Sequence, residues 1–180
     1  MAWQLDTAHS ELAFAVKHMM VSTVRGRFRT FGAEIDLNEK RAGDSRVDVT
    51  IDLASVDTGN EMRDNHLRSA DFFDVAKYPT ATFVSKRVEE RGEGEYHVIG
   101  DLSLHGVTRE TPLTVTAEGP HRDMQSQRRL GFTITGTINR KDFDLNYNAA
   151  LEAGGWVVGD TVKLQIEVEA LEPATVATTA

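Results

Sequence analysis

Strict alternation of apolar and polar side chains is the feature that most constrains the fold of this chain. In "SELAFAVKH" (residues 10–18) Leu12, Phe14 and Val16 take alternate positions, and "RVDVTIDL" (46–53) and "TVKLQIEVEAL" (161–171) repeat the pattern. A period of two sends successive side chains to opposite faces of a β-strand, so each strand has one dry face and one wet face. Strands of this kind are typical of antiparallel sheets.

Further segments alternate with more noise. They are "TATFVSKRV", "EYHVIGDLSLH", "TPLTVTAEG" and "LGFTITGTI". In residues 24–37 the apolar positions change from even to odd numbers, which predicts a bulge or bend near Thr30. With no βαβ rhythm, about eight or nine strands indicate one antiparallel sheet, either closed as a barrel or folded as a sandwich. A barrel of about eight strands has an interior that is filled or holds one ligand.

Composition limits the classes of function. The chain has 180 residues, 40% hydrophobic and 27% charged, which suits a single domain over residues 1–171 with a flexible tail at 172–180. The net charge of −8 disfavours a nucleic-acid partner, and the absence of cysteine excludes disulfides and thiolate chemistry. No segment approaches the ~20 apolar residues of a membrane span, and residues 1–11 lack the pattern of a signal peptide, which predicts a cytoplasmic protein.

One segment departs from the strand pattern and predicts a helix that crosses between strands. Thr58 and Glu61 fit a capping box, and the run that follows is long enough for about three turns, to Phe73. Asp64 and Arg68 are spaced as a surface ion pair. An apolar stripe of Met62, His66, Leu67, Ala70 and Phe73 would lie over a barrel mouth as a lid.

The titratable residues do not assemble into a predicted catalytic or metal site. Arg63, Asp64 and His66 are close in sequence, as an acid/base cluster would be, but Arg63 and Asp64 diverge by about 100° around a helix axis. Ion pairing and capping are therefore their favoured role. The same-face set of His97, Asp101 and His105 is too extended to chelate one ion, since strand residues four apart lie ~13 Å apart. No established catalytic motif is present.

Two features remain open between a structural and a ligand-binding role. His18 ends the apolar row of residues 12–18, so its imidazole is either a satisfied structural group or a hydrogen-bond partner for the polar head of a ligand. Phenylalanines fall on the apolar face of four strands, at Phe14, Phe28, Phe83 and Phe132. They predict a solid core, or an apolar tunnel if the core is incompletely filled.

Four stretches of the chain resemble a known family. They are "DTAHSELAFAVKHMMVSTVRGRF", "SVDTGNEMRDNHLRSADFFDVAKYPTATFVS", "GDLSLHGVTRETPLTV" and "INRKDF". They are similar to the YceI-like family of bacterial polyisoprenoid-binding proteins, over about residues 3–171. The resemblance implies an extended lipocalin-like antiparallel β-barrel, often a homodimer, that holds a long isoprenoid or similar amphiphilic lipid in its tunnel.

The resemblance transfers to particular residues as cavity lid and framework. These are Arg63, Asp64, His66, Leu67, Phe72, Phe73, Tyr78 and Pro79. Asp144 stands after Phe143 where the family usually has glycine, and many members look exported whereas this chain shows no leader.

The combined prediction is an all-β, lipocalin-like barrel of about eight strands with one short crossover helix. It binds and carries or sequesters an isoprenoid or similar amphiphilic lipid, for example an isoprenoid quinone or polyprenyl lipid, as a homodimer without catalytic residues, cofactor or metal. The predicted ligand-binding residues are Phe14, Val16, His18, Phe28, Ile51, Met62, Arg63, His66, Leu67, Phe83, Leu102, Leu104, Phe132 and Ile134. The alternatives are an enzyme that acts on a lipid or quinone through His18 or His66, and an interaction module with a filled barrel.

Overall fold

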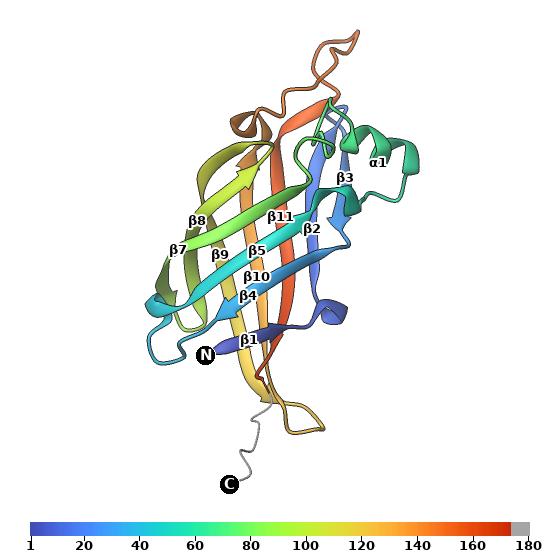
Figure 1. Ribbon diagram of the computed structural model, residues 1–180. Helices are drawn as coiled ribbons and strands as arrows, with labels where there is room; N and C mark the ends of the chain where they lie inside the picture. The colour runs from blue at the N-terminus through green and yellow to red at the C-terminus, as the bar shows by residue number, and fades with distance from the viewer. Residues whose placement is uncertain (174–180) are drawn as a thin grey trace.

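The alternating segments form long antiparallel strands in the computed structural model, which describes residues 1–173 (Figure 1). In chain order the strands are β1 (Ala2–Leu5), β2 (Glu11–His18), β3 (Ser22–Phe28), β4 (Phe31–Asp36), β5 (Arg46–Asp52), β6 (Val56–Asp57), β7 (Thr80–Gly92), β8 (Glu95–Leu104), β9 (Val107–Arg122), β10 (Arg128–Asn139) and β11 (Val158–Leu171). The helical elements are α1 (Glu61–Arg68) and the 3-10 turns η1 (Thr7–His9), η2 (Ala42–Asp44), η3 (Leu53–Ser55) and η4 (Arg140–Phe143).

The sheet closes on itself, which decides between the barrel and the sandwich. Hydrogen-bonded pairing runs β1-β4-β5-β7-β8-β9-β10-β11, and β1 pairs with β11 as well as with β4, so eight strands complete a ring. The predicted barrel of about eight strands is therefore confirmed. β11 pairs with β1 only at its C-terminal end. The rest of β11 pairs with β2, for example Leu164 with Phe14, and β3 and β6 extend the sheet beyond β2.

Inward side chains repeat along each strand as the alternation predicts. Phe132 pairs with Val168 and Ile134 with Ile166 across β10 and β11, so the apolar rows of the two strands share one face. At about 3.3 Å per residue, the 16 residues of β9 extend roughly 50 Å, which makes the barrel elongated (Figure 1).

The chain bends where the apolar parity changes. β3 ends at Phe28 and β4 begins at Phe31, so the predicted bend near Thr30 lies between them. Thr30 N donates to Ser55 Oγ at 3.0 Å, which satisfies a backbone group that leaves the sheet at the bend. The change of register lets both apolar rows face the interior.

The predicted helix forms but is shorter than expected. α1 has eight residues and ends at Arg68 rather than Phe73. The predicted cap at Thr58 is wrong, because the Asn60 side chain accepts from Arg63 N and serves as the N-cap. Asn is at least as good an N-cap as Thr, and Thr58 is engaged by other partners.

Two further expectations for α1 are corrected. Met62 is 83% exposed and does not face the barrel, because the shortened helix turns Leu67 inward instead. Asp64 and Arg68 do not pair on the surface: buried Asp64 accepts from Thr58 N and Oγ1, and Arg68 Nε donates to Ala54 O. Buried backbone groups need partners more than two exposed charges need each other.

The first residue of the predicted tail contacts the barrel. Glu172 N donates to Arg128 O at 2.9 Å, and the Glu172 carboxylate pairs with the Arg128 guanidinium. The remainder of the predicted tail, residues 174–180, lies outside the described residues. No helix within residues 1–173 has the length and apolar character that crossing a bilayer requires.

Candidate functional site: an apolar cavity with one polar end

A cavity of about 690 Å³ runs inside the barrel. Inward side chains of the strands form its wall, among them Val49 of β5, Val115 of β9 and Leu164 of β11. Cavities that hold a drug-sized ligand have volumes of this order and mainly apolar linings. The interior is thus not filled by side chains, which contradicts the alternative of a solid barrel.

Alternation placed many predicted contact residues on this wall. The predicted residues that line the cavity are Phe14, Val16, Phe28, Ile51, Leu67, Phe83, Leu102, Leu104, Phe132 and Ile134. They come from β2, β3, β5, α1, β7, β8 and β10, which are far apart in the sequence. The closed barrel brings them around one space.

The polar candidates lie outside the wall. Met62, His18, Arg63 and His66 are not among the residues that line the cavity. His18 ends β2 beside Val158, and Arg63 is engaged with Thr58, to whose Oγ1 and carbonyl oxygen its guanidinium donates. The catalytic alternative requires a histidine in the cavity wall. Within the described residues, no histidine lines the cavity.

The segment after α1 covers one end of the cavity. Leu67, Phe72 and Phe73 line that end. Phe72 also belongs to a three-ring cluster with His66 and Tyr147, in which each pair of ring centroids is 4.9 or 5.0 Å apart. His66 Nε2 lies 2.8 Å from Asp71 Oδ2, so its polar edge is occupied on the outside of the cover.

The opposite end of the cavity is polar and reaches solvent. Its exposed rim residues are Glu39, Arg46 and Glu93, from the β4–β5 connection, the start of β5 and the β7–β8 turn (Figure 1). Tyr96 lines the wall just inside, and its hydroxyl has no hydrogen-bond partner within the described residues. Sequence reasoning missed this end because it treated the polar stretches there as turns alone.

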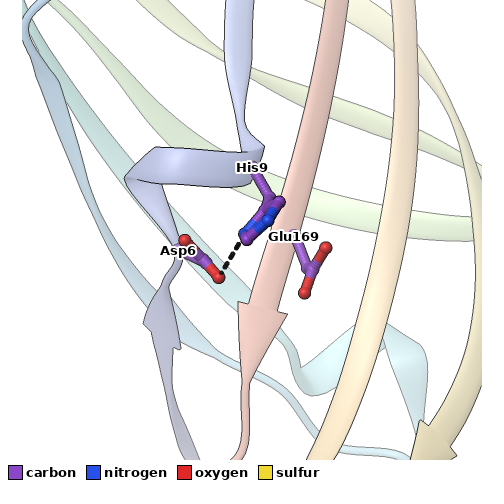
Figure 2. Close-up of side chains that lie close together, drawn as sticks. All are labelled: Asp6, His9 and Glu169. Carbon is purple, nitrogen blue, oxygen red and sulfur yellow. Dashed lines mark hydrogen bonds and ion pairs between the residues drawn. The ribbon is translucent and has the colours of Figure 1, made fainter. Parts of the chain in front are cut away.

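A second polar cluster lies where η1 meets the outer face of β11 (Figure 2). Asp6, His9 and Glu169 bring ligand-type atoms within 4.8 Å of one another. The Arg129 guanidinium contacts Asp6 at 3.2 Å and also pairs with Glu169 and with Asp123. These carboxylates are already paired with the Arg129 guanidinium, so the cluster is an ion-pair network rather than a metal site.

The network shifts the pKa values of Asp6, His9 and Arg129. The hydrogen bond to the Asp6 carboxylate raises the pKa of His9, and the same bond lowers the pKa of Asp6. The Glu169 and Asp123 carboxylates raise the pKa of Arg129. His9, which sequence reasoning left in a turn, is therefore the titratable group to test near neutral pH.

The remaining histidine set does not converge. His97 lies within β8, whereas His105 follows the strand in a turn with φ of 54°. His105 Nδ1 lies 3.2 Å from Phe143 O, and its ring packs edge-on to Tyr78. His105 thus joins the β8–β9 turn to η4 and to the segment after α1.

Comparisons with known proteins agree with this architecture. The YceI-like domain family matches residues 3–170. A UPF0312 protein of Staphylococcus epidermidis is 39% identical over 168 residues, which cover 93% of this chain and 95% of the relative. The crystal structure of Burkholderia cenocepacia BcnA superposes with a TM-score of 0.81 at 26% identity, and covers 92% of this chain and 99% of that one.

A third similar structure differs more in sequence. It is a polyisoprenoid binding domain from Saccharophagus degradans implicated in plant cell wall breakdown, with a TM-score of 0.68 and 23% identity over 96% of this chain and 99% of that one. At this identity the likeness concerns the fold.

Proposed function

Because this chain belongs to the YceI-like domain family, we propose that it binds an isoprenoid or a similar amphiphilic lipid in the barrel cavity and carries or sequesters it. The observation that supports the proposal is the cavity itself: about 690 Å³ of apolar interior that reaches solvent at one polar end. An isoprenoid quinone and a polyprenyl lipid both combine a long apolar tail with a compact polar head, which suits a cavity that is apolar along its length and polar at one end.

Burial of the tail would drive binding. Each Å² of apolar surface removed from water contributes roughly 25 cal/mol, and the wall offers aliphatic and phenyl groups along most of its length. A charged group in the same place would lose its hydration without compensation. The wall therefore favours tails that carry no charge.

The polar end indicates how the ligand is oriented. Arg46, Glu93 and Tyr96 are candidates to contact the head group, with the tail directed toward Leu67 and Phe73 at the covered end. This assignment replaces the predicted contacts from His18, Arg63 and His66, which do not line the cavity. A few convergent polar groups at the mouth of an apolar pocket usually set orientation and specificity.

The ligand class and the non-catalytic role are proposals supported by the relatives. The Saccharophagus degradans domain of the same fold is described as polyisoprenoid-binding, which makes isoprenoids the first lipids to test. The cavity wall offers apolar contacts and no histidine–carboxylate pair within the described residues. We propose a binding protein that acts without a cofactor or metal.

Extraction of the native guest tests the proposal. Protein purified without detergent is treated with organic solvent, and the extract is analysed by mass spectrometry beside an extract of the same cells' total lipid. We expect isoprenoid species to be enriched in the protein fraction. A protein that yields no lipid, and that takes up neither a quinone nor a polyprenyl lipid when these are added, would contradict the proposal.

Location and assembly are further proposals. We propose a cytoplasmic location and a homodimer, the assembly that the family resemblance implies. Cell fractionation tests the first, and sedimentation velocity over a range of concentrations tests the second. A monomer at all concentrations, or recovery from the cell exterior, would contradict the respective proposal.

A further inference from the structure

Two loops at the α1 end of the barrel expose apolar side chains. The β2–β3 hairpin loop presents Met19, Met20 and Val21, of which Met20 is 65% and Val21 83% exposed. Loop 146–157, between η4 and β11, presents Trp156, which is 57% exposed. We call these four side chains the apolar tip. Soluble proteins rarely cluster exposed apolar groups without an interaction partner.

The two loops form one surface. Met19 N donates to Val157 O at 2.8 Å, which ties the hairpin loop to the end of loop 146–157. The sulfur of Met20 lies over Gly155, where a Cβ atom would be only 2.1 Å away. Figure 1 shows loop 146–157 rising beyond the end of the barrel, next to the top of β2 and β3, so the apolar tip is convex.

The hairpin holds its methionines in an unfavourable backbone conformation. Val21 N donates to His18 O at 3.2 Å, and φ is 50° at Met19 and 62° at Met20. Positive φ at both central positions of the turn from His18 to Val21 is the pattern of a type I′ turn, for which Asn-Gly is the preferred pair. Two long apolar side chains occupy a turn that a short polar pair would form more easily, and such strain is typical of functional sites.

Cations without partners lie just below the apolar tip. Lys17, Arg25 and Lys163 are exposed on the adjacent strands β2, β3 and β11, where Ala15 pairs with both Arg25 and Lys163. None of the three forms an ion pair within the described residues, although the chain has a net charge of −8. We call them the basic belt.

The acidic groups near the apolar tip are few. Loop 146–157 contains one, Glu152. Asp160, at the start of β11, lies 3.2 Å from the Lys141 ammonium and is thereby partly neutralised. Loop 146–157 and the start of β11 thus carry few free carboxylates, whereas α1 and the segment after it add acidic residues such as Glu61, Asp71 and Asp74 at the same end of the barrel.

We infer that the apolar tip inserts into the interfacial layer of an anionic lipid bilayer while the basic belt contacts the head groups. Tryptophan is favoured at membrane interfaces, and the flexible methionine side chain adapts to irregular apolar surroundings. Lysine and arginine close to an anionic membrane strengthen such attachment. A second copy of this chain is a poorer occupant, since a two-fold contact at the convex tip would bring two basic belts together.

Docking would place the covered end of the cavity, toward which the tail is proposed to point, at the bilayer. Loop 146–157 is bracketed by Leu145 and Val158, and both of these residues line the cavity. A carrier of membrane lipid must meet the membrane to load or deliver its guest, so the biological purpose of docking rests on the proposed function. The attachment itself rests on the apolar tip and the basic belt.

Vesicle binding by the full chain tests the inference. Sedimentation with vesicles of phosphatidylglycerol and phosphatidylcholine is compared with vesicles of phosphatidylcholine alone. The matched variants are Met19→Asn/Met20→Gly, which suits the type I′ turn and so keeps the hairpin folded, and Met124→Ser, which removes a 97% exposed methionine at the other end of the barrel.

We expect wild type and Met124→Ser to bind the anionic vesicles equally, and the turn variant to bind about tenfold or more weakly. Lys17→Glu/Arg25→Glu should abolish the preference for anionic vesicles, and high salt should act likewise. Trp156 emission should shift to the blue on binding, and Trp156→Phe should remove the shift. The inference is overturned if wild type binds neither kind of vesicle, or if the turn variant binds anionic vesicles as strongly as wild type does.

Two measurements separate this inference from the others. If the turn variant converts a dimer to a monomer in sedimentation velocity and vesicle binding is absent, the apolar tip is a self-association surface and the inference is wrong. Lipid extraction from the same preparations reports the cavity separately. A guest without vesicle binding overturns docking alone. Vesicle binding by a protein that yields no guest and takes up neither an added quinone nor an added polyprenyl lipid overturns the proposed function alone.

Discussion

Arg140 shows how one buried side chain can join segments that are distant in the sequence. It is 3% exposed, and its Nε donates to Gly159 O at 2.9 Å. Its Nη1 donates to Leu145 O and Tyr147 O, and its Nη2 to Val158 O. The guanidinium thus fastens both ends of loop 146–157 to the barrel. Burial lowers the pKa of Arg140, but a guanidinium still remains charged at physiological pH.

Replacing Arg140 by methionine should be strongly destabilising. The change leaves several buried carbonyl groups without donors, each worth about 1–3 kcal/mol, and we expect the free energy of unfolding to fall by about 3–5 kcal/mol. Urea denaturation followed by circular dichroism measures the loss. Lys141→Met, at an exposed neighbour, should change stability by less than about 1 kcal/mol. Equal effects of the two variants would contradict this assignment.

The pKa shift of His9 predicts a pH-dependent contribution to stability. Its pKa is raised in the folded protein by Asp6, so the contribution is complete below the unfolded value of about 6.5 and is lost as the pH rises through the folded value. We expect His9→Gln to lower Tm relative to wild type at pH 5.5 and to leave Tm nearly unchanged at pH 8.5. The effect should be small because the His9 side chain is 64% exposed.

A matched histidine controls for general effects of pH. His121→Gln changes an exposed histidine that makes no ion pair within the described residues, and its effect on Tm should not vary between the two pH values. A His9→Gln variant whose Tm difference from wild type is the same at pH 5.5 and pH 8.5 would show that the pair with Asp6 does not contribute as proposed.

Residues with a local rule were predictable from the sequence, and residues with distant partners were not. The inward positions of Phe83 and Ile134 follow from alternation alone. Arg140 and His9 depend on contacts that exist only after the barrel closes, since Arg140 reaches Gly159 and the network of His9 includes Arg129. Neither spacing nor composition encodes those contacts.

At the scale of elements, α1 is held by a polar clasp rather than by its apolar stripe. Asp64 is buried and accepts from both Thr58 N and Thr58 Oγ1, while Arg63 donates to Thr58 O at 2.8 Å. The clasp fixes the start of the helix next to β6. The sequence indicated a helix here, but its length and cap were wrong because Thr58 serves the clasp.

Asp64→Ala should loosen this element. The variant leaves the Thr58 N–H and hydroxyl without their acceptor, so we expect the free energy of unfolding to fall by about 1–3 kcal/mol. Amide hydrogen exchange should be faster across residues 58–68 than in wild type. Met62→Ala, at an exposed position of the same helix, serves as control. Unchanged exchange in α1 of Asp64→Ala would show that the clasp is unimportant.

The element boundaries that the sequence did predict have a clear physical origin. The bend at Thr30 follows from a change in apolar parity, which a regular strand cannot accommodate. Asp144, where the resemblance implied glycine, adopts a left-handed conformation with φ of 60° and ψ of 25°. Aspartate tolerates this region better than most residues, so the turn keeps the shape that glycine would favour.

At the scale of the whole molecule, closure of the sheet creates the cavity on which the proposed function rests. Alternation could not distinguish a barrel from a sandwich, because both bury one face of every strand. The deciding contact is the pairing of the four-residue β1 with both β4 and β11, which involves only a few residues at the N-terminal end of the chain. The volume left inside also depends on packing that no local pattern specifies.

Cavity occupancy can be tested with two neighbouring residues of β10. Ile134 lines the cavity, whereas Thr133 is exposed on the outside of the same strand. Ile134→Trp should fill interior space and lower the amount of bound lipid by about tenfold or more, since each buried apolar group of the tail contributes about 0.8 kcal/mol per CH₂. Uptake of a radiolabelled polyprenyl lipid measures the difference.

Thr133→Trp adds the same side chain to the opposite face of the strand and should leave lipid uptake unchanged. Both variants should keep the circular dichroism spectrum of the barrel, because the cavity has room for part of the added ring and the outer face faces solvent. If Thr133→Trp reduces uptake as much as Ile134→Trp, the lipid does not occupy the interior, and the polar groups at the far rim lose their proposed role as head-group contacts.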